Sequence, residues 1–155
     1  MPEDKSDPIA DFDLNAFLPY RLNAAAARVS RAFAERYRAQ FGISIAEWRV
    51  LAHLHHAGTV SVRDIEARTE MEKSKVSRAA TRLEQAGYVT KAVNDADRRL
   101  VQLSLTPQGR ALVARLLPVA MRFQAEMKAR LGAQAEGLSA ALTILLADPS
   151  MDRRR

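Results

Sequence analysis

Hydrophobic residues recur at helical spacing near both ends of the chain. From Leu14 to about Gly42, apolar side chains return every three or four residues, with Arg, Asn and Glu between them, which predicts one long amphipathic helix. Pro19 marks either a kink or an early turn of this helix, since proline cannot donate to the hydrogen-bond ladder of a helix interior. A second long helix is predicted over 107–131, opened by a proline at its first position, and a last helix over 135–147.

Three shorter helices are predicted between these long ones. Ser44 and Glu47 have the spacing of a capping box at the start of the first. Ser61 caps the second, which covers about 62–69. A polar turn leads to the third, over about 72–86, and a glycine follows it.

After this third helix the period of the pattern changes from helix to strand. Residues 88–93 and 100–105 alternate apolar and polar side chains around a polar segment, which predicts a β-hairpin over about 88–105. A short helix, a turn, a longer helix and a hairpin with a basic tip follow one another in the order of a winged helix-turn-helix.

The predicted fold class is therefore mainly α with a small β-hairpin wing. We expect one domain over 1–155, in which a winged helix-turn-helix lobe covers 44–106. The long helices over 14–42 and 107–147 are expected to form a dimer interface.

Charge identifies the helix over 72–86 as the candidate recognition helix. The chain has a formal net charge of +6, and between Lys73 and Arg99 seven Lys and Arg residues stand against three acids. On this helix the residues expected to pack inward are Val76, Ala79, Ala80, Leu83 and Ala86. Arginine can bond to guanine in the major groove, serine and threonine suit bases or phosphates, and lysine suits phosphates. The side chains expected to contact DNA are Ser74, Lys75, Ser77, Arg78, Thr81 and Arg82.

The tip of the hairpin carries the second candidate DNA contact. Arg98 and Arg99 can enter the narrow, electronegative minor groove beside the site that the helix reads. Asp97 can orient one of these arginines through a paired contact, or it can serve as a turn residue, and both interpretations are open.

Four segments of the chain resemble the multiple-antibiotic-resistance regulators, the MarR family. The segment 97–109 carries Asp97-Arg98-Arg99 and ends in Leu105-Thr106-Pro107-Gln108-Gly109, and the other matches are 17–22, 45–51 and 76–84. The resemblance implies a homodimer, a recognition helix over 71–86 and Arg99 at the family's minor-groove position. It also implies regulation of nearby genes, usually repression relieved by a small phenolic or other anionic ligand. The family's peroxide-sensing branch is excluded, because this chain has no cysteine.

A ligand pocket is expected between the dimer helices and the winged-helix lobe. Its candidate lining residues are Phe17, Tyr20, Arg21, Trp48 and His55, although aromatic residues at helical spacing are more often core residues. A metal site is not expected. The spacing of His53, His55 and His56 does not put all three on one helix face.

The composition excludes several other classes of protein. With no cysteine there is neither a disulfide framework nor a thiolate zinc site, so a reducing cytoplasm is expected. Residues 1–13 do not resemble a secretory signal, and the longest apolar run, 140–147, is too short to cross a membrane. The sequence has no glycine-rich phosphate loop and no recognisable catalytic triad, so neither an enzyme nor a cofactor is expected.

The predicted function is that of a homodimeric regulator that binds a palindromic operator in double-stranded DNA, acting as a repressor released by a small molecule. The alternative is a winged-helix module that pairs with a protein. That module would need an apolar outer face on the candidate recognition helix, and the outer face here is polar.

Overall fold

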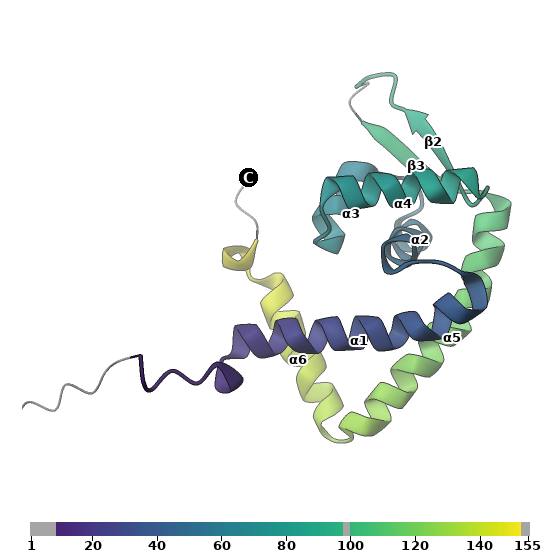
Figure 1. Cartoon of the computed structure of the whole chain (residues 1–155). Coiled ribbons are helices and arrows are strands. Elements are labelled where there is room, and N and C mark those ends of the chain that lie inside the picture. The colour runs from purple at the N-terminus through teal and green to yellow at the C-terminus, as the bar shows by residue number, and fades with distance from the viewer. Residues whose placement is uncertain (1–8, 98–99, 153–155) are drawn as a thin grey trace, which may run out of the picture.

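The computed structural model describes residues 9–97 and 100–152. Helices α1, α5 and α6 form an outer frame, and α2, α3 and α4 with a small sheet form a lobe held against it (Figure 1). Their bounds are α1 Leu18–Phe41, α2 Ile45–Ala57, α3 Val62–Thr69, α4 Lys73–Gln85, α5 Pro107–Leu131 and α6 Gln134–Ala147. Two short 3-10 helices, Leu14–Ala16 and Pro149–Met151, flank the frame.

The first helix begins four residues later than its periodicity predicts. Phe17 has an extended backbone, with φ −75° and ψ 111°, and it separates the 3-10 helix from α1. Pro19 therefore lies in the first turn of α1, where a missing N–H costs no helical hydrogen bond. The early-turn interpretation of Pro19 is confirmed.

Local capping explains the other helix boundaries. Ser44 Oγ accepts a hydrogen bond from Glu47 N at 3.2 Å, and the Glu47 carboxylate accepts one from Ser44 N, so the predicted capping box is present. Ser61 caps α3 and Thr106 caps α5 in the same way, each accepting from the backbone N–H three residues later. Each cap fixes the residue at which the chain turns into a helix.

The wing belongs to a three-stranded antiparallel sheet. Its strands are β1 Val60–Ser61, β2 Val89–Val93 and β3 Val101–Leu105, in the order β1-β3-β2. The register pairs Val93 with Val101 near the tip and Val89 with Leu105 at the base, as the predicted hairpin requires. The sequence analysis missed β1, because its two residues are too few to show an alternating pattern.

The hydrophobic core lies between α2, α4, β3 and the first half of α5. Its largest fully buried side chains include Leu51, Leu54, Leu83, Leu103 and Leu116. An aromatic cluster joins this core to α1: the Phe33 ring lies 5.1 Å from that of Trp48 and 4.9 Å from that of Tyr37, both edge-on. The lobe is therefore attached to the C-terminal half of α1.

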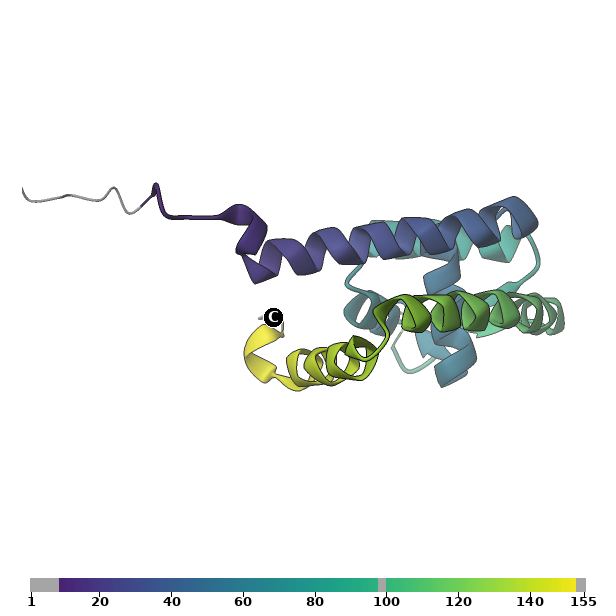
Figure 2. The same cartoon turned by 90° about the horizontal axis from the view of Figure 1, so that it is seen from below.

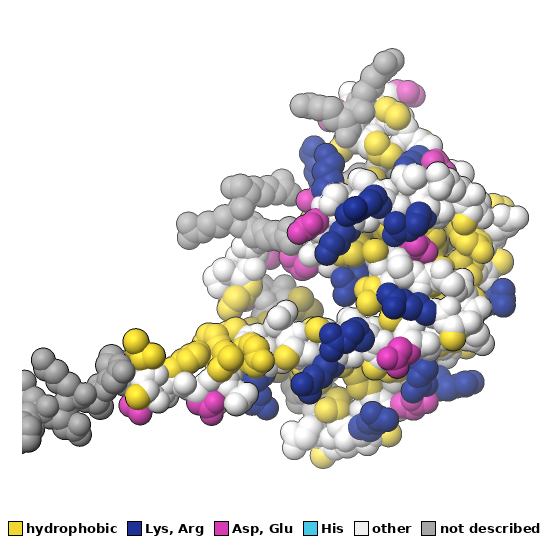
Figure 3. Space-filling view, in the orientation of Figure 1, with side chains coloured by type: hydrophobic (Ala, Val, Ile, Leu, Met, Phe, Trp, Pro, Cys, Tyr) yellow, Lys and Arg dark blue, Asp and Glu magenta, His cyan; other side chains and the backbone are white. Residues whose placement is uncertain are grey.

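The N-terminal half of α1 and the whole of α6 leave apolar side chains uncovered. No residue of α6, which is described throughout, is buried, and Ile144 and Leu146 are 71% and 84% exposed. Leu18 is 64% exposed, and hydrophobic side chains gather over this end of α1 (Figure 3). Seen from below, α1 and the α5–α6 pair lie in two layers that open toward this end (Figure 2). No helix in the described ranges is long and apolar enough to cross a membrane.

Candidate nucleic-acid interface

Helix α4, the predicted recognition helix, buries one face and exposes the other. Val76, Ala79, Ala80 and Leu83 are at most 1% exposed, which confirms four of the five residues predicted to pack inward. The prediction for Ala86 is wrong, because this residue is the exposed C-cap of α4. The helix ends there because Gly87, with φ +84°, reverses the chain so that Tyr88 N reaches Leu83 O at 2.9 Å.

The outer face of α4 carries the polar side chains predicted to contact DNA. Ser74, Lys75, Arg78, Thr81 and Arg82 are exposed, and Ser77 is half-buried. Lys and Arg side chains gather in front of α4 and over the middle of α1 (Figure 3). This face therefore has the polarity and charge of a surface that binds a polyanion.

The N-terminal and C-terminal halves of the outer face of α4 differ in the contacts of their arginines. Arg78 Nε donates to Ser74 O at 3.3 Å, and Arg78 has no ion-pair partner among the described residues. Arg82 Nε, by contrast, donates to Glu47 Oε1 at 2.7 Å and forms an ion pair between α4 and α2. From the sequence, Glu47 is expected only as a capping residue, because its second partner, Arg82, lies 35 positions away.

Lys91 is a further cation at this surface that the sequence analysis missed. Its Nζ lies 2.8 Å from Thr81 Oγ1, to which it donates, and 4.0 Å from Glu84 Oε1. The strand pattern gives the face of the hairpin on which Lys91 lies, but the distance between β2 and α4 is decided by tertiary packing. Lys91 joins the wing to the predicted recognition helix.

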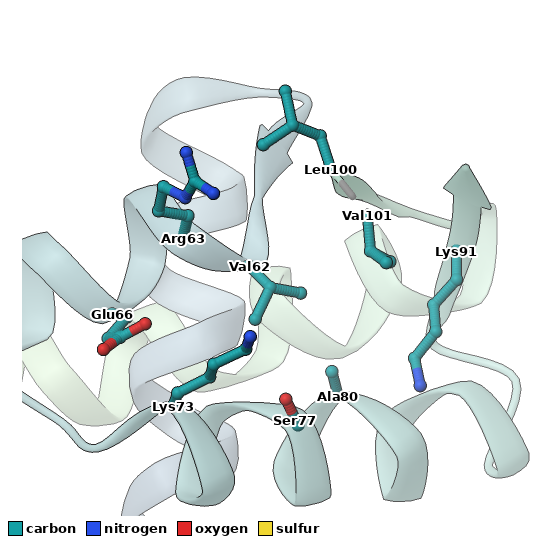
Figure 4. Close-up of a pocket in the computed structure, with 9 residues that line it drawn as sticks. All are labelled: Val62, Arg63, Glu66, Lys73, Ser77, Ala80, Lys91, Leu100 and Val101. Atoms are coloured by element: carbon teal, nitrogen blue, oxygen red, sulfur yellow. The ribbon is translucent and has the colours of Figure 1, made fainter. Parts of the chain in front are cut away.

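A basic hollow of about 240 Å³ lies between α3, α4 and the wing. Lys73 and Ser77 reach it from α4, Lys91 enters from β2, and Val62 and Val101 give it an apolar wall (Figure 4). Arg63 and Glu66 of α3 also line it. The hollow continues the basic outer face of α4 toward the wing.

Asn94 organises the described part of the wing tip. Its Oδ1 accepts from Ala96 N at 2.8 Å and from Asp97 N at 3.3 Å, and its own N–H donates to Leu100 O. This is the turn that an Asn side chain forms with the backbone two residues ahead. Asp97 is half-buried and its carbonyl accepts from Leu100 N, which agrees with its turn interpretation. The predicted contacts of Arg98 and Arg99 lie outside the described residues.

The five residues proposed for a ligand pocket lie at separate places among the described residues. Trp48 is half-buried and packs on Phe33 and Tyr37 at the edge of the core, and His55 is exposed near the end of α2. Tyr20 and Arg21 line a shallow groove on α1 itself. Trp48 packs on Phe33, which is 13 residues beyond Tyr20, or about 20 Å along the helix. Trp48 therefore packs against a different part of α1 from the one that carries Tyr20.

A larger hollow, of about 750 Å³, lies between the frame and the lobe at the place where the pocket is expected. It is lined by residues of α1, of α2 and of the turn from α3 into α4. Its cations are Arg31, Arg49 and Lys75, and Arg49 also donates to Ser30 Oγ at 3.4 Å. Glu70 and Glu72 lie on its rim beside Met71. The sequence does not predict this set, because its members come from separate elements along the chain.

The histidines of α2 do not gather with other ligands. Within the described ranges, no group of three or more His, Asp and Glu side chains is placed to hold a metal ion. Burial lowers the pKa of His53 below its usual value, and nearby Arg68 and His56 lower it further. Both effects favour the neutral form of His53.

A helix-turn-helix followed by a β-hairpin, β2 and β3, that extends beyond α4 defines a winged-helix protein. A model of the MarR family matches residues 41–100, which span α2 to the wing. A MarR-family transcriptional regulator from Silicibacter pomeroyi has the same fold with 29% identity, a TM-score of 0.72, and coverage of 89% of this chain and 93% of that one. The resemblance to the MarR family and the predicted fold class are both confirmed.

Other relatives extend the comparison. The transcriptional repressor MdtR of Bacillus subtilis is 40% identical over 68 residues, and the regulator YdgJ of the same species is 28% identical over 106 residues. These matches cover 44% and 68% of this chain, and they span only 44% and 65% of the relatives' own lengths. BpsR of Bordetella bronchiseptica, whose DNA binding is regulated by 6-hydroxynicotinic acid, shares the fold with 24% identity, a TM-score of 0.74 and coverage of 88% of this chain and 97% of its own.

Proposed function

We propose that this protein is a homodimeric transcription regulator that binds palindromic double-stranded DNA through α4 and the wing, and that it catalyses no reaction. The observation that carries the proposal is the outer face of α4. There Ser74, Lys75 and Arg78 are exposed directly opposite a fully buried face, next to a hairpin. Such a face can enter a major groove while the core holds the helix in place. A DNA-binding role also agrees with the expected cytoplasmic location.

The protein-pairing alternative lacks its main requirement. A docking face for a protein partner would present a cluster of exposed apolar side chains on α4, and the exposed side chains of the outer face are polar or charged. Most of the exposed large apolar side chains among the described residues lie instead on α1, on α6 and in the segment before α1. We assign those faces to a second copy of this chain.

Selection from a random duplex library tests DNA binding directly. We expect the full chain to enrich a palindrome whose half-sites are about one helical turn apart, because a two-fold dimer presents two copies of α4 to one side of the duplex. The matched control is the Arg78→Ala variant. Failure of the wild-type chain to enrich any duplex would contradict the proposed function, and enrichment of an unpaired half-site would contradict the two-fold dimer.

Repression and its release by a ligand form the finer part of the proposal. The hollow between α1, α2 and the turn from α3 into α4 combines three cations and two carboxylates, Glu70 and Glu72, with a serine hydroxyl and apolar Ile45 and Met71, and its net positive charge suits a small aromatic anion. A ligand there would contact both the frame and the lobe, so it could shift the lobe away from its DNA-binding position.

A reporter gene behind the selected palindrome tests repression. We expect the wild-type chain to lower expression and a ligand to restore it, and an increase in expression would instead indicate an activator. Binding of aromatic carboxylates, measured by calorimetry, tests the hollow. Arg31→Ala should weaken ligand binding and leave DNA affinity unchanged, whereas an unchanged ligand affinity would contradict the placement of the ligand.

A further inference from the structure

Arg82 was expected from the sequence to contact DNA, yet its side chain is engaged within the chain. Arg82 Nε donates a charge-assisted hydrogen bond of 2.7 Å to Glu47 Oε1, in the first turn of α2. The Glu47 side chain is only 12% exposed, whereas that of Arg82 is 52% exposed. If Arg82 moved to a DNA phosphate, it would leave behind a carboxylate that has little contact with water and has lost its cationic partner.

Glu47 is itself held in place by its own helix. Its Oε2 accepts from Ser44 N, and its backbone N–H donates to Ser44 Oγ, so both halves of the capping box restrain it. The partial positive charge at the start of α2 also favours a carboxylate there. The acceptor of Arg82 is therefore a fixed point on α2, and it is not a mobile surface side chain.

Thr81, the neighbour of Arg82, is also engaged within the chain. Its Oγ1 donates to Ser77 O at 2.9 Å and accepts from Lys91 Nζ at 2.8 Å. The C-terminal half of α4 is thus connected to α2 by one side chain and to β2 by another. In the N-terminal half, Lys75 and Arg78 form no ion pair within the described ranges.

From these contacts we infer that Arg82 is a positioning residue, which holds α4 in a fixed orientation on α2 through Glu47 and does not itself neutralise a phosphate. The inference rests on the proposed DNA-binding function and refines it. The outer face of α4 then has a reading half, formed by Ser74, Lys75 and Arg78, and an anchoring half, formed by Thr81 and Arg82. In helix-turn-helix proteins it is the N-terminal residues of the recognition helix that reach base edges, which agrees with this division.

Two substitutions that change the net charge in opposite directions test the inference. Arg82→Ala removes a positive charge and Glu47→Ala removes a negative one, so electrostatic attraction alone predicts that the first weakens DNA binding and the second strengthens it. A positioning role predicts that both weaken binding to the selected palindrome, each by about tenfold. The double variant should bind no more weakly than either single variant, because both lose the same contact.

Matched variants separate positioning from helix stability and from phosphate contact. Ser44→Ala removes the hydroxyl half of the capping box but keeps the Ser44 N–H bond to the Glu47 carboxylate and the Arg82–Glu47 pair, so it should lower DNA affinity much less than Glu47→Ala does. Lys75→Ala should lower the slope of log affinity against log salt concentration by about one, whereas Arg82→Ala should keep the wild-type slope. Fluorescence anisotropy gives the affinities, and circular dichroism verifies folding at the assay temperature. Arg82→Gln is measured alongside, because it removes the charge of Arg82 but keeps a longer side chain than alanine.

Four results would overturn the inference and leave the proposed function standing. They are tighter binding by Glu47→Ala, a reduced salt slope for Arg82→Ala, additive losses in the double variant, and a loss in Ser44→Ala equal to that in Glu47→Ala. If the wild-type chain selects no DNA at all, the proposed function fails and the inference fails with it.

Discussion

Arg78 and Lys75 are neighbours on the exposed face of α4, yet their side chains suit different parts of a DNA duplex. The planar guanidinium of Arg78 can donate two parallel hydrogen bonds to guanine, and only its Nε is engaged by Ser74 O. The Lys75 ammonium is a compact charge that serves best beside a phosphate. The residue type therefore decides whether each contact carries sequence information.

Alanine substitution should separate these two contributions. Arg78→Ala should cost about 1–3 kcal/mol of binding free energy on the selected palindrome and relax the base preference at one position of each half-site. Lys75→Ala should weaken binding to all duplexes alike and lower the salt slope by about one. Anisotropy titrations on the palindrome and on a scrambled duplex measure both effects. Equal losses on the two duplexes for both variants would mean that Arg78 does not read bases.

At the scale of elements, the first turn of α5 packs tightly against the start of the wing. Thr106 N donates to Tyr88 O at 3.0 Å, which fixes that carbonyl, and Gly109 lies beside it in the cap of α5. A Cβ at Gly109 would collide with the Tyr88 carbonyl, which cannot move without breaking this hydrogen bond. The glycine thus sets the distance between the frame and the lobe.

Substitution of two helical glycines tests this close approach. Gly109→Ala should lower the free energy of unfolding by about 1–3 kcal/mol, because the added methyl group forces the backbone apart. Gly137→Ala is the matched control in α6, where a Cβ would meet nothing within 4 Å. It should be neutral or stabilise the fold by up to about 1 kcal/mol, as alanine favours the helix. Urea denaturation measures both variants, and a neutral Gly109→Ala would show that the contact is not restrictive.

An ion pair between α1 and α5 should make the stability of the folded protein depend on pH. Arg36 Nη2 donates to Glu126 Oε2 at 2.6 Å, and this hydrogen bond lowers the pKa of Glu126 below its usual value. A carboxylate whose pKa is lower in the folded than in the unfolded state stabilises the fold above its unfolded pKa of about 4.3. This contribution is lost as the pH falls through the folded-state pKa.

The melting temperature measured at a series of pH values tests this dependence. Between about pH 5 and 3, the wild-type chain should lose more thermal stability than Glu126→Gln, which has no charge to lose. The difference should be small, because the Arg36 and Glu126 side chains are 41% and 43% exposed and water screens the pair. Glu35→Gln, on the exposed side of α1, should follow the wild-type curve. Identical curves for all three proteins would contradict a stabilising role.

At the scale of the whole molecule, the exposed apolar faces of α1 and α6 account for the proposed dimer. The N-terminal half of α1 and helix α6 both lie at the end of the molecule away from the wing (Figure 1). Exposure of these apolar side chains to water is unfavourable, and in a two-fold dimer they can be buried against the same face of a second copy of the chain. Dimerisation would also fix the spacing of the two α4 helices.

A charged residue placed on this face should prevent association. Leu146→Asp, at a position 84% exposed in the single chain, should sediment as a monomer at micromolar concentration, where the wild type sediments as a dimer. Val93→Asp is the matched control, since Val93 is 57% exposed on the wing and should leave the dimer intact. A monomeric wild type would contradict the proposed assembly.

The sequence by itself determined those features that depend on residues within about four positions of one another. The capping box of Ser44 and Glu47, the cap of α5 at Thr106 and the buried face of α4 all follow from such local spacing. The family resemblance rested on the same local segments. Helix order and the position of the wing could therefore be predicted without a structure.

The tertiary structure alone decided which distant side chains meet. The Arg82–Glu47 pair, the Lys91–Thr81 hydrogen bond and the hollow around Arg49 each join separate elements, and no periodicity in the sequence carries that information. Trp48 is half-buried at the edge of the core because Phe33 and Tyr37 of α1 pack against it. Hydrophobic spacing identifies the face of an element that is buried, but it does not identify the partner of each polar side chain, because that partner depends on how the elements pack together.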